Sequence, residues 1–292
     1  MIYLKLFLTA FFWGGTFIAG KLIAPVIDPY SAAFLRFLIA SVFLIGLTLK
    51  IEGQLIKPTV KQMWGVSFLG VTGIFSYNLF FFFGLHYIQA NQASLIIATN
   101  PIFISLAAAL FFKEKLYFHK IAGLFLSVTG ALIVISNGHL SDVLKLGAGR
   151  GQVLIFGCVV SWVAYSIVGK KVMKDLSPIT SVCYSSIAGT FFLFFPAVFN
   201  GMFEYVPAYR SLEWINLFYL GFFGTVLGFF WYYEGIRAIG PLRAGMFINF
   251  VPVSAIILSF FILNEPLTPA LTVGGVFVVT GVILTNSIPS RA

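Results

Sequence analysis

The run FLRFLIASVFLIGL, residues 34–47, holds one charged residue, Arg36, among apolar and small residues. A guanidinium stays charged at physiological pH and presents a planar fork of donors that matches a carboxylate. An arginine at the centre of a lipid-spanning helix costs about 2.5–3.5 kcal/mol, so such residues usually face a cavity or a partner. Arg36 is therefore a candidate anchor for an anionic ligand. Two alternatives stay open, a side chain that extends to the lipid headgroups and a structural bond to helix-end carbonyls.

Aromatic and amide side chains lie deep inside other apolar segments of the chain. Indole rings at mid-depth can stack on a flat ligand, although packing between helices is an alternative. Polar groups in lipid-length helices normally turn toward the interior of the bundle. With Arg36, we predict that the following residues line a substrate cavity: Trp13, Tyr77, Asn78, Asn100, Trp162, Tyr184, Tyr232 and Asn249.

Pro101 and Pro252 lie near the middle of two apolar segments. Proline removes one helix hydrogen bond and clashes with the preceding turn, so it bends a helix and frees a carbonyl. We predict that these prolines kink their helices, either simply to shape the bundle or to expose a carbonyl to a ligand.

Residue patterns of enzymes are scarce. His86, His119 and His139 are isolated, and Cys158 and Cys183 lie in apolar runs, so we predict no catalytic residues, no metal and no cofactor. Glu114 and Glu265 stand at predicted helix junctions, where a structural role is favoured over proton coupling. The GAGRG run at 147–151 lacks the context of a phosphate-binding loop and is interpreted as a hinge.

The elements that must position these residues are transmembrane helices. The chain of 292 residues is 60% hydrophobic and only 9% charged, whereas about 25% of residues are charged in soluble domains. A span needs about 20 apolar residues. Ten segments meet this requirement: 3–21, 30–49, 63–84, 91–112, 118–137, 151–170, 178–199, 212–233, 242–263 and 267–287. The fold class predicted is all-α, with ten transmembrane helices and no room for a soluble catalytic domain.

Lysine and arginine predict the orientation, because they are retained on the cytoplasmic side. Only Lys21, Lys145, Arg150 and Arg210 fall on the side opposite the N-terminus, and nearly all the others fall on the N-terminal side. Both termini are therefore predicted to be cytoplasmic. The net charge of +9 follows from this bias and gives no reason to expect binding of nucleic acid.

The sequence also repeats itself. Trp13 and Gly20 match Trp162 and Gly169 at an offset of 149 residues, and later positions match at an offset of 151, including the following pairs: Gly84 with Gly235, Pro101 with Pro252, Glu114 with Glu265, Gly123 with Gly274, and Gly130 with Gly281. We predict a first five-helix repeat at 1–146 and a second at 147–292. Since five is odd, the second repeat enters the membrane inverted, as in many secondary transporters whose site lies between the repeats.

The chain resembles the drug/metabolite transporter superfamily, EamA type, over nearly its whole length. The resemblance rests on FFWGGTFIAGK (11–21), on Pro29 followed by AAFLRF, on GLHYIQANQASLI (84–96) leading to Asn100-Pro101, and on FFKEKL (111–116) repeated as ILNEPL (262–267). It implies a ten-helix carrier in which spans 1–4 and 6–9 surround a cavity, with spans 5 and 10 at the periphery. It also implies export of small metabolites, often amino acids, including the aromatic ones, or toxic analogues.

Together these features predict an inner-membrane secondary transporter that exports or exchanges amino acids or related metabolites by alternating access. One alternative is a nucleotide-sugar or organophosphate exchanger, another is a drug efflux carrier, and a third, from another class, is an intramembrane enzyme acting on lipids. The expected partners are a small-molecule substrate and the lipid bilayer. The glycines at 123, 130, 274 and 281 suit either tight helix contact or a homodimer.

Overall fold

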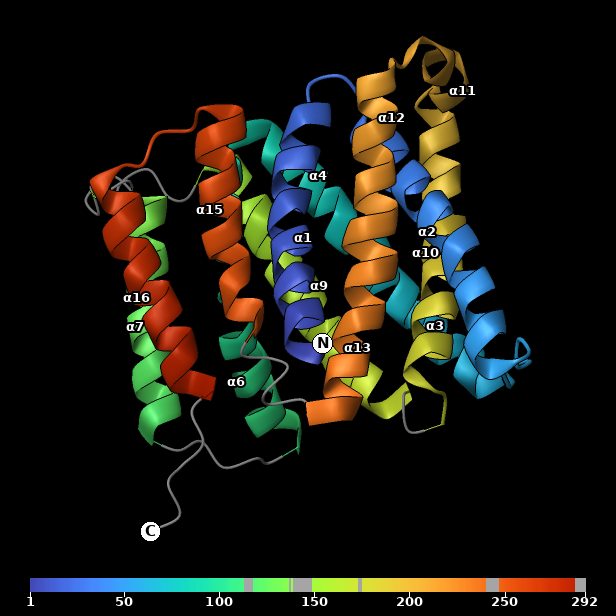
Figure 1. Ribbon diagram of the computed structural model, residues 1–292, viewed down its shortest axis with the longest axis horizontal. Coiled ribbons are helices and arrows are strands. Elements are labelled where there is room, and N and C mark those ends of the chain that lie inside the picture. The colour runs from blue at the N-terminus through green and yellow to red at the C-terminus, as the bar shows by residue number, and fades with distance from the viewer. Residues whose placement is uncertain (113–117, 137, 139–148, 173–174, 240–246, 287–292) are drawn as a thin grey trace.

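The computed structural model describes residues 1–112, 118–136, 138, 149–172, 175–239 and 247–286. Within these residues the chain consists of helices joined by turns and short loops and contains no strand. Figure 1 shows the helices as a bundle of roughly parallel and antiparallel rods, with α7 and α16 side by side at one edge and α2 and α10 at the other.

The first half of the chain contains an unbroken pair of long helices, a third helix that widens in its middle and a fourth that is broken. Their bounds are as follows: α1, Ile2–Ile23; α2, Pro29–Glu52; α3, Val60–Leu69, which continues through the π-helical segment Gly70–Ser76 into α4, Tyr77–Tyr87; α5, Ala90–Ile97; α6, Asn100–Phe112; and α7, Phe118–Ile135.

The second half follows the same order. Its elements are α9, Arg150–Val172; α10, Pro178–Phe199; α11, Met202–Tyr205, with the 3₁₀ turn Val206–Ala208; α12, Ser211–Phe218, which continues through the π-helical segment Tyr219–Leu227 into α13, Gly228–Ile239; the 3₁₀ turn Phe247–Asn249; α15, Phe250–Leu263; and α16, Pro269–Asn286.

The same local device starts α2 and α10. The Asp28 carboxylate accepts a hydrogen bond from the backbone N–H of Ser31 at 3.0 Å, and Pro29 follows at the first helical position. In α10 the Ser177 hydroxyl caps the N–H of Thr180 and is followed by Pro178. A side-chain oxygen before proline satisfies an end donor and fixes the first turn, so both helices begin where the sequence predicts.

In the part of the chain that the structure describes, six helices are long and apolar enough to cross a membrane: Ile2–Ile23, Pro29–Glu52, Val60–Tyr87, Arg150–Gly169, Pro178–Phe199 and Ser211–Tyr232. Three further apolar helices are shorter, at Ile121–Val134, Phe250–Leu263 and Pro269–Gly281. The composition of these helices agrees with a multi-pass membrane protein. The count of ten crossings and the side on which the termini lie stay predictions.

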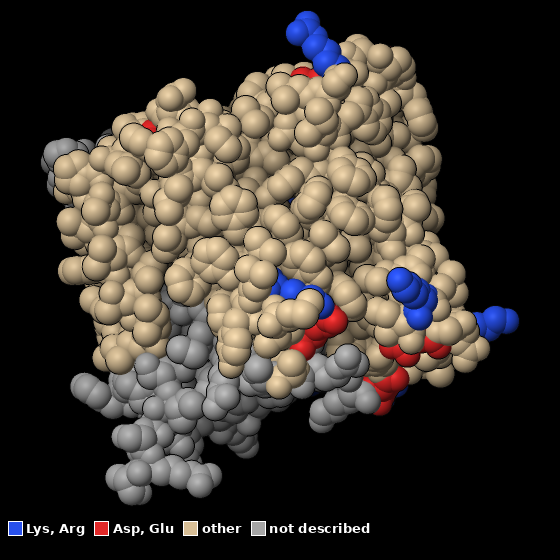
Figure 2. Space-filling model, viewed as in Figure 1, with Lys and Arg blue, Asp and Glu red and all other residues tan. Residues whose placement is uncertain are grey.

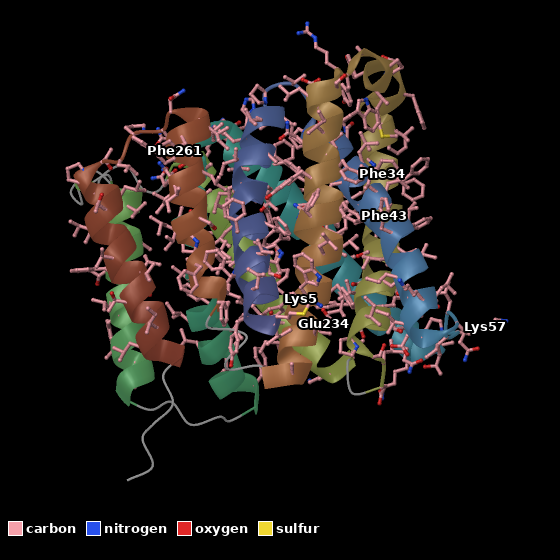
Figure 3. All side chains as sticks on the ribbon, in the orientation of Figure 1. Lys5, Phe34, Phe43, Lys57, Glu234 and Phe261 are labelled. Atoms are coloured by element: carbon pink, nitrogen blue, oxygen red, sulfur yellow. The ribbon has the colours of Figure 1, made fainter. Side chains whose placement is uncertain are left out.

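The surface agrees with a lipid environment. On the face shown in Figure 2, lysine, arginine and acidic residues gather at the two ends of the bundle, and uncharged residues cover the region between them. Large apolar side chains are exposed along this region, for example Phe43 on α2 and Phe261 on α15, both labelled in Figure 3. Such a belt would be costly in water and is favourable against lipid chains.

Close approaches between helices occur in pairs that repeat along the sequence. The pairs are Gly84 with Ile155 and Gly235 with Leu6; Gly73 with Tyr165 and Gly224 with Thr16; and Gly70 with Ser185 and Gly221 with Arg36. In each pair the two glycines are 151 residues apart and their partners are 149 residues apart, which are the two offsets of the sequence repeat. Each half therefore contacts the other through matching positions.

The glycines of the predicted fifth and tenth spans bring α7 and α16 together within one chain. The Gly130 Cα lies so close to α16 that an added Cβ would stand 2.5 Å from the Gly274 carbonyl oxygen, and the corresponding atom on Gly281 would stand 2.5 Å from the Gly123 carbonyl oxygen. The Ser127 hydroxyl donates to the Val278 carbonyl at 2.9 Å across the same contact. These glycines thus serve a helix contact inside the protomer.

The two prolines begin helices instead of bending them in the middle. Pro101 follows the first residue of α6, after a break at Ala98 and Thr99, and Pro252 lies in the first turn of α15. The fourth span is split into α5 and α6 at the place where a kink is predicted, and the part of both prolines in gating stays a prediction. The physical reason is that proline is well tolerated in a first turn, where no helix bond is lost.

Candidate functional site

A cavity of about 430 Å³ lies between the two halves of the chain. It is lined from α1, α2, the α4, α5 and α6 segments, α9, α13 and α15, with contributions from the π-helical segment Tyr219–Leu227 and from α16. A volume of this size falls within the range of small-molecule sites. Among the described residues, Arg36 is the one charged side chain that lines it.

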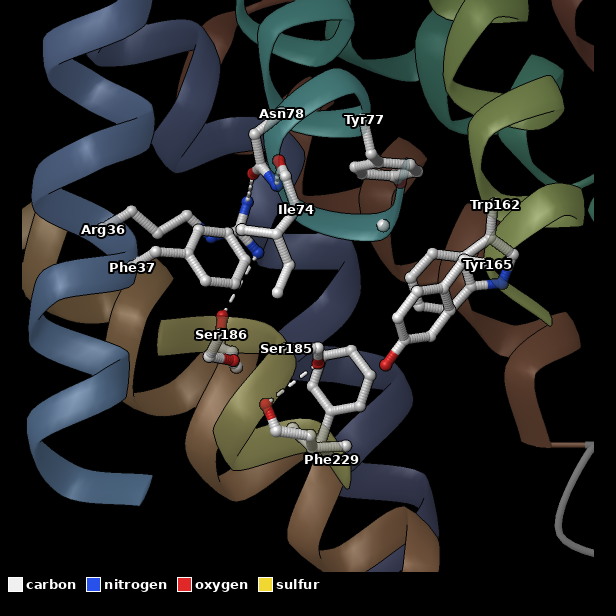
Figure 4. Close-up of a pocket in the computed structure, with 13 residues that line it drawn as sticks. Arg36, Phe37, Ile74, Tyr77, Asn78, Trp162, Tyr165, Ser185, Ser186 and Phe229 are labelled. Carbon is white, nitrogen blue, oxygen red and sulfur yellow. Dashed lines mark hydrogen bonds between the residues drawn. The ribbon is translucent and has the colours of Figure 1, made fainter. Parts of the chain in front are cut away.

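Arg36 is buried, with 8% of its surface exposed, and its guanidinium points into the bundle (Figure 4). One terminal nitrogen, Nη1, donates to the Asn78 Oδ1 at 3.0 Å, and Nη2 lies 3.4 Å from the Thr225 hydroxyl oxygen. The buried Nε has no partner within the described part of the chain. Both partners are neutral. Among the described residues, no carboxylate pairs with Arg36 to balance the charge of its guanidinium.

Asn78 holds the guanidinium in a fixed direction. Its Nδ2 donates to the Ile74 carbonyl at 2.7 Å, one turn earlier and at the junction of the π-helical segment with α4. Because the amide is fixed by that bond, its oxygen is the atom that faces Arg36. The side chain of Asn78 is almost fully buried, at 1% exposure.

Aromatic rings form much of the remaining wall. The Trp13 ring centroid lies 5.4 Å from that of Tyr232, and the Trp162 centroid lies 5.5 Å from that of Tyr77. The Trp13 indole N–H donates to the Gly224 carbonyl at 2.8 Å, which fixes the ring. Rings held in this way offer flat, apolar faces to a ligand.

A small side pocket of about 40 Å³ adjoins the cavity behind Arg36. Ser185 and Ser186 of α10 line it, and so do Asn78 and Thr225. The Ser186 hydroxyl is buried and without a partner in the described structure. These serines occupy the position in the second repeat that corresponds to Arg36 in the first, so one half supplies a cation where the other supplies hydroxyl groups.

The structure brings most of the predicted residues to one place. Trp13, Arg36, Tyr77, Asn100, Trp162, Tyr232 and Pro252 all line the large cavity, and Asn78 lines the side pocket. Tyr184 does not line either; its hydroxyl donates to the Ile56 carbonyl at 2.6 Å at an exposed position. The side chains of Asn249 and Pro101 lie outside the described residues.

The reason why Tyr184 lines neither pocket is its position around the helix. Val182, Ser185 and Ser186 share the face of α10 that lines the side pocket, whereas position 184 is turned away from it. Three further residues line the site without having been predicted from the sequence: Thr225, Tyr165 and Phe229. Thr225 could have been found, since a hydroxyl inside an apolar segment normally points inward.

Glu265 has a structural position, but it caps a different helix from the one expected. Its carboxylate accepts from the backbone N–H groups of Ala90 and Asn91 at 2.8 and 3.0 Å, at the start of α5. Nearby, the Lys21 ammonium donates to the Leu85 and Ile88 carbonyls at the end of α4. Both contacts fasten the α4–α5 connection, which lies beside the cavity wall. Glu114 lies outside the described residues.

The described residues contain no group of three or more histidine, cysteine or acidic side chains that could hold a metal. Cys158 and Cys183 are buried, free thiols. The site as described is an apolar, aromatic cavity with one cation and several neutral polar groups, which is suited to binding a small organic molecule.

A ligand-sized cavity enclosed by apolar, membrane-length helices defines the class as a polytopic membrane protein with an internal binding site. The model of the EamA-like transporter family matches residues 1–136 and again residues 149–287. The chain therefore belongs to the EamA-like transporter family, within the drug/metabolite transporter superfamily.

Relatives span nearly the whole chain. The uncharacterized transporter YyaM of Bacillus subtilis is 29% identical over 98% of this chain and 94% of its own length. A probable terminal-alkyne amino-acid exporter of Streptantibioticus cattleyicolor is 28% identical over 79% of this chain and 75% of its own. One crystal structure superposes with a TM-score of 0.70 at 19% identity, covering 97% of both chains, which shows a shared fold.

Proposed function

We propose that the protein is an inner-membrane secondary transporter that exports or exchanges small carboxylate-bearing metabolites, amino acids or related compounds, and that it is not an enzyme. The observation that carries the proposal is the buried Arg36 guanidinium at the wall of the cavity, with neutral partners and one nitrogen without a partner. A buried charge is costly unless it is paired. A carboxylate on the cargo would supply the missing pair.

The shape of the site supports a two-part cargo. Arg36 and the Ser186 hydroxyl, which has no partner among the described residues, offer hydrogen bonds to an anionic group, and the aromatic rings around Trp13 and Trp162 offer apolar surface. An amino acid with a flat or apolar side chain has both parts. The name of the Streptantibioticus relative, a probable amino-acid exporter, agrees with this substrate class.

Alternating access follows from the repeats. We propose that residues 1–146 and 147–292 form two inverted five-helix repeats that rock against each other around the cavity. Support comes from the family model, which matches once in each half, and from the paired glycine contacts with their shared offsets. Because the two interfaces match, the two repeats can exchange their conformations. This exchange would open the cavity first to one side of the membrane and then to the other.

The other candidate functions have weaker support. A nucleotide-sugar or organophosphate carries two or more negative charges, whereas Arg36 is the one described cation at the cavity wall. A cationic drug would be repelled by the same residue. An enzyme acting on lipids needs a nucleophile, base or metal site, and the detection of a chemically changed product would revive that alternative.

Exchange transport in proteoliposomes tests the proposal. Vesicles containing the wild type or Arg36→Gln are loaded with labelled amino acids, organic acids, purines or cationic drugs, and protein-free vesicles serve as the control. We expect the wild type to exchange amino or organic acids and the folded variant to lose them. Wild-type exchange of purines or cationic drugs, with no carboxylate moved, would contradict the proposal.

A further inference from the structure

The break between α5 and α6 exposes hydrogen-bond acceptors at the cavity wall. Ile97 would normally accept from the residue four positions later, but that residue is Pro101, which has no N–H. The usual donor to the Ala98 carbonyl is the N–H of Ile102, which donates instead to the Thr99 carbonyl at 3.0 Å. Ile97 and Ala98 are both lining residues of the cavity, so two carbonyls without their usual helix donors belong to its wall at the C-terminal end of α5.

The side-chain oxygen of Asn100 is a further hydrogen-bond acceptor at this end of the cavity. Asn100 is 8% exposed and lines the same cavity, and its Oδ1 is buried without a hydrogen-bond partner among the described residues. An unpaired buried acceptor costs about 1–3 kcal/mol, so its retention at a cavity wall points to a ligand that donates to it. The negative end of the α5 dipole lies at the same place and favours a positive charge there.

The cavity therefore has two chemically opposite ends. Arg36 on α2 presents hydrogen-bond donors with a positive charge, and the α5–α6 break presents neutral oxygens with a partial negative charge. No described aspartate or glutamate lines the cavity, so these oxygens are its strongest described acceptors for a cation. An ammonium group, with three N–H donors, fits such a set of oxygens.

We propose that Asn100, together with the carbonyls of Ile97 and Ala98, forms a subsite for the ammonium group of the cargo, so that the transporter selects zwitterionic amino acids over plain carboxylates. This inference rests on the proposed function, in which Arg36 takes the carboxylate. Asn100 is then a residue that determines specificity.

Matched ligands that differ only in the amino group test this subsite. The pairs are phenylalanine with 3-phenylpropionate, leucine with 4-methylpentanoate, and methionine with 4-(methylthio)butanoate. Dissociation constants are measured by calorimetry on the purified protein, which avoids the leak of weak acids through vesicles. We expect the wild type to bind at least one amino acid about tenfold or more tightly than its deaminated partner.

Two substitutions at one position separate the chemistry from the packing. Asn100→Leu removes the acceptor at similar size and is expected to abolish the preference for the amino acid, with binding of the deaminated acid changed less than threefold. Asn100→Asp keeps an acceptor oxygen of the same shape and is expected to retain the preference. Size-exclusion profiles and thermal unfolding establish that each variant is folded. If Asn100→Leu does not fold, Asn100→Thr replaces it. The threonine side chain is shorter, so its hydroxyl cannot reach the place of the amide oxygen.

Three results would overturn the subsite while leaving the proposed function in place. In the first, the wild type binds both members of every pair equally. In the second, the variant without the amide oxygen keeps the wild-type preference. In the third, the variant without the amide oxygen keeps the preference for amino acids but changes how binding depends on Na⁺. That result would assign the oxygens to a metal cation. By contrast, if the wild type binds neither member of any pair and transports no carboxylate, the proposed function itself fails.

Discussion

At the scale of single residues, the site depends on how Arg36 is held. Its two hydrogen bonds are to an amide oxygen and a hydroxyl, so the guanidinium is oriented without being neutralised. Asn78 is the positioning residue in this arrangement, because its own amide is fixed by the Ile74 carbonyl. A neutral positioning group leaves the positive charge available to a ligand, whereas an acidic one would occupy it.

Replacing that neutral group by an acid should therefore block the anchor. In Asn78→Asp a carboxylate of the same shape stands about where Oδ1 stands, 3.0 Å from the Arg36 nitrogen. The buried ion pair competes with the cargo, and we expect affinity for a carboxylate ligand to fall about tenfold or more. Calorimetric titration measures the effect. Asn78→Leu removes the hydrogen bond to Arg36 without adding a charge, and we expect it to lower affinity less than Asn78→Asp does; equal losses in both variants would show that the added charge does not compete with the cargo.

The sequence identifies the kinds of residue at the site better than their directions. Tryptophan, tyrosine, asparagine and arginine inside apolar segments are visible without a structure, and most of those named line the cavity. Tyr184 is an exception, because the buried hydroxyl residues Ser181 and Ser185 mark the inward face of α10 and position 184 is turned away from that face. The inward direction of the Thr225 hydroxyl could be predicted, but its contact with Arg36, 189 residues away in sequence, is visible only in the structure.

At the scale of helices, Glu265 fastens the start of α5 from the connection between α15 and α16. The carboxylate is 6% exposed and accepts two backbone N–H bonds. Glu265→Ala leaves both donors unsatisfied, and we expect it to lower the free energy of unfolding by about 1–3 kcal/mol. Denaturant or thermal unfolding in detergent measures this change.

Glu234→Gln is the matched control for that experiment. Glu234 pairs with Lys5 at 2.6 Å near one end of the bundle (Figure 3), and both side chains are partly exposed, at 25% and 31%. Partly exposed pairs contribute little, so we expect a loss of less than about 1 kcal/mol. A larger loss for Glu234→Gln than for Glu265→Ala would contradict this ranking.

The α7–α16 contact depends on the absence of side chains at its centre. A Cβ at Gly130 would meet backbone atoms of α16, which cannot move aside as a flexible side chain can. We expect Gly130→Ala to lower stability by about 1–3 kcal/mol in the same unfolding assay. Gly46→Ala is the control, since nothing lies within 4 Å of its added Cβ and alanine favours the helix. Equal stability of the two variants would refute the close contact.

Element boundaries were largely predictable, and local irregularities were not. Proline, capping residues and apolar length place most helix ends within a few residues. The π-helical segments Gly70–Ser76 and Tyr219–Leu227 each contain two glycines three residues apart, but this spacing does not by itself predict a wider turn. The break before Asn100 was anticipated only as a kink, since proline alone does not reveal whether the preceding turn stays helical.

At the scale of the whole molecule, the orientation rests on the distribution of positive charge. We expect both termini in the cytoplasm and the α10–α12 connection, which contains Arg210, on the other side. A fluorescent-protein fusion after residue 292 should fluoresce, and an alkaline phosphatase fusion should be active after residue 208 and inactive after residue 292. The reverse pattern of phosphatase activity would show that the chain has the opposite orientation in the membrane.

The repeat was visible in sequence because a few glycines, prolines and tryptophans recur at two close offsets. Its three-dimensional consequence was not visible, namely that equivalent positions meet, as the Ser41 and Thr190 hydroxyls do at 3.1 Å, 149 residues apart. The same equivalence makes the departures informative. Arg36 has serines as its counterpart, and this difference marks the place where the cavity is specialised.

The most direct measurement compares binding of an amino acid with binding of its primary amide, in the wild type and in Arg36→Gln. The two ligands have the same side chain, nearly the same size and the same amino group, and they differ in whether the carboxylate is present. We expect the wild type to prefer the amino acid, and the folded variant to lose about tenfold or more in affinity for it while binding the amide about as before. If the variant binds both ligands as the wild type does, or loses both equally, Arg36 is not the anchor of the cargo.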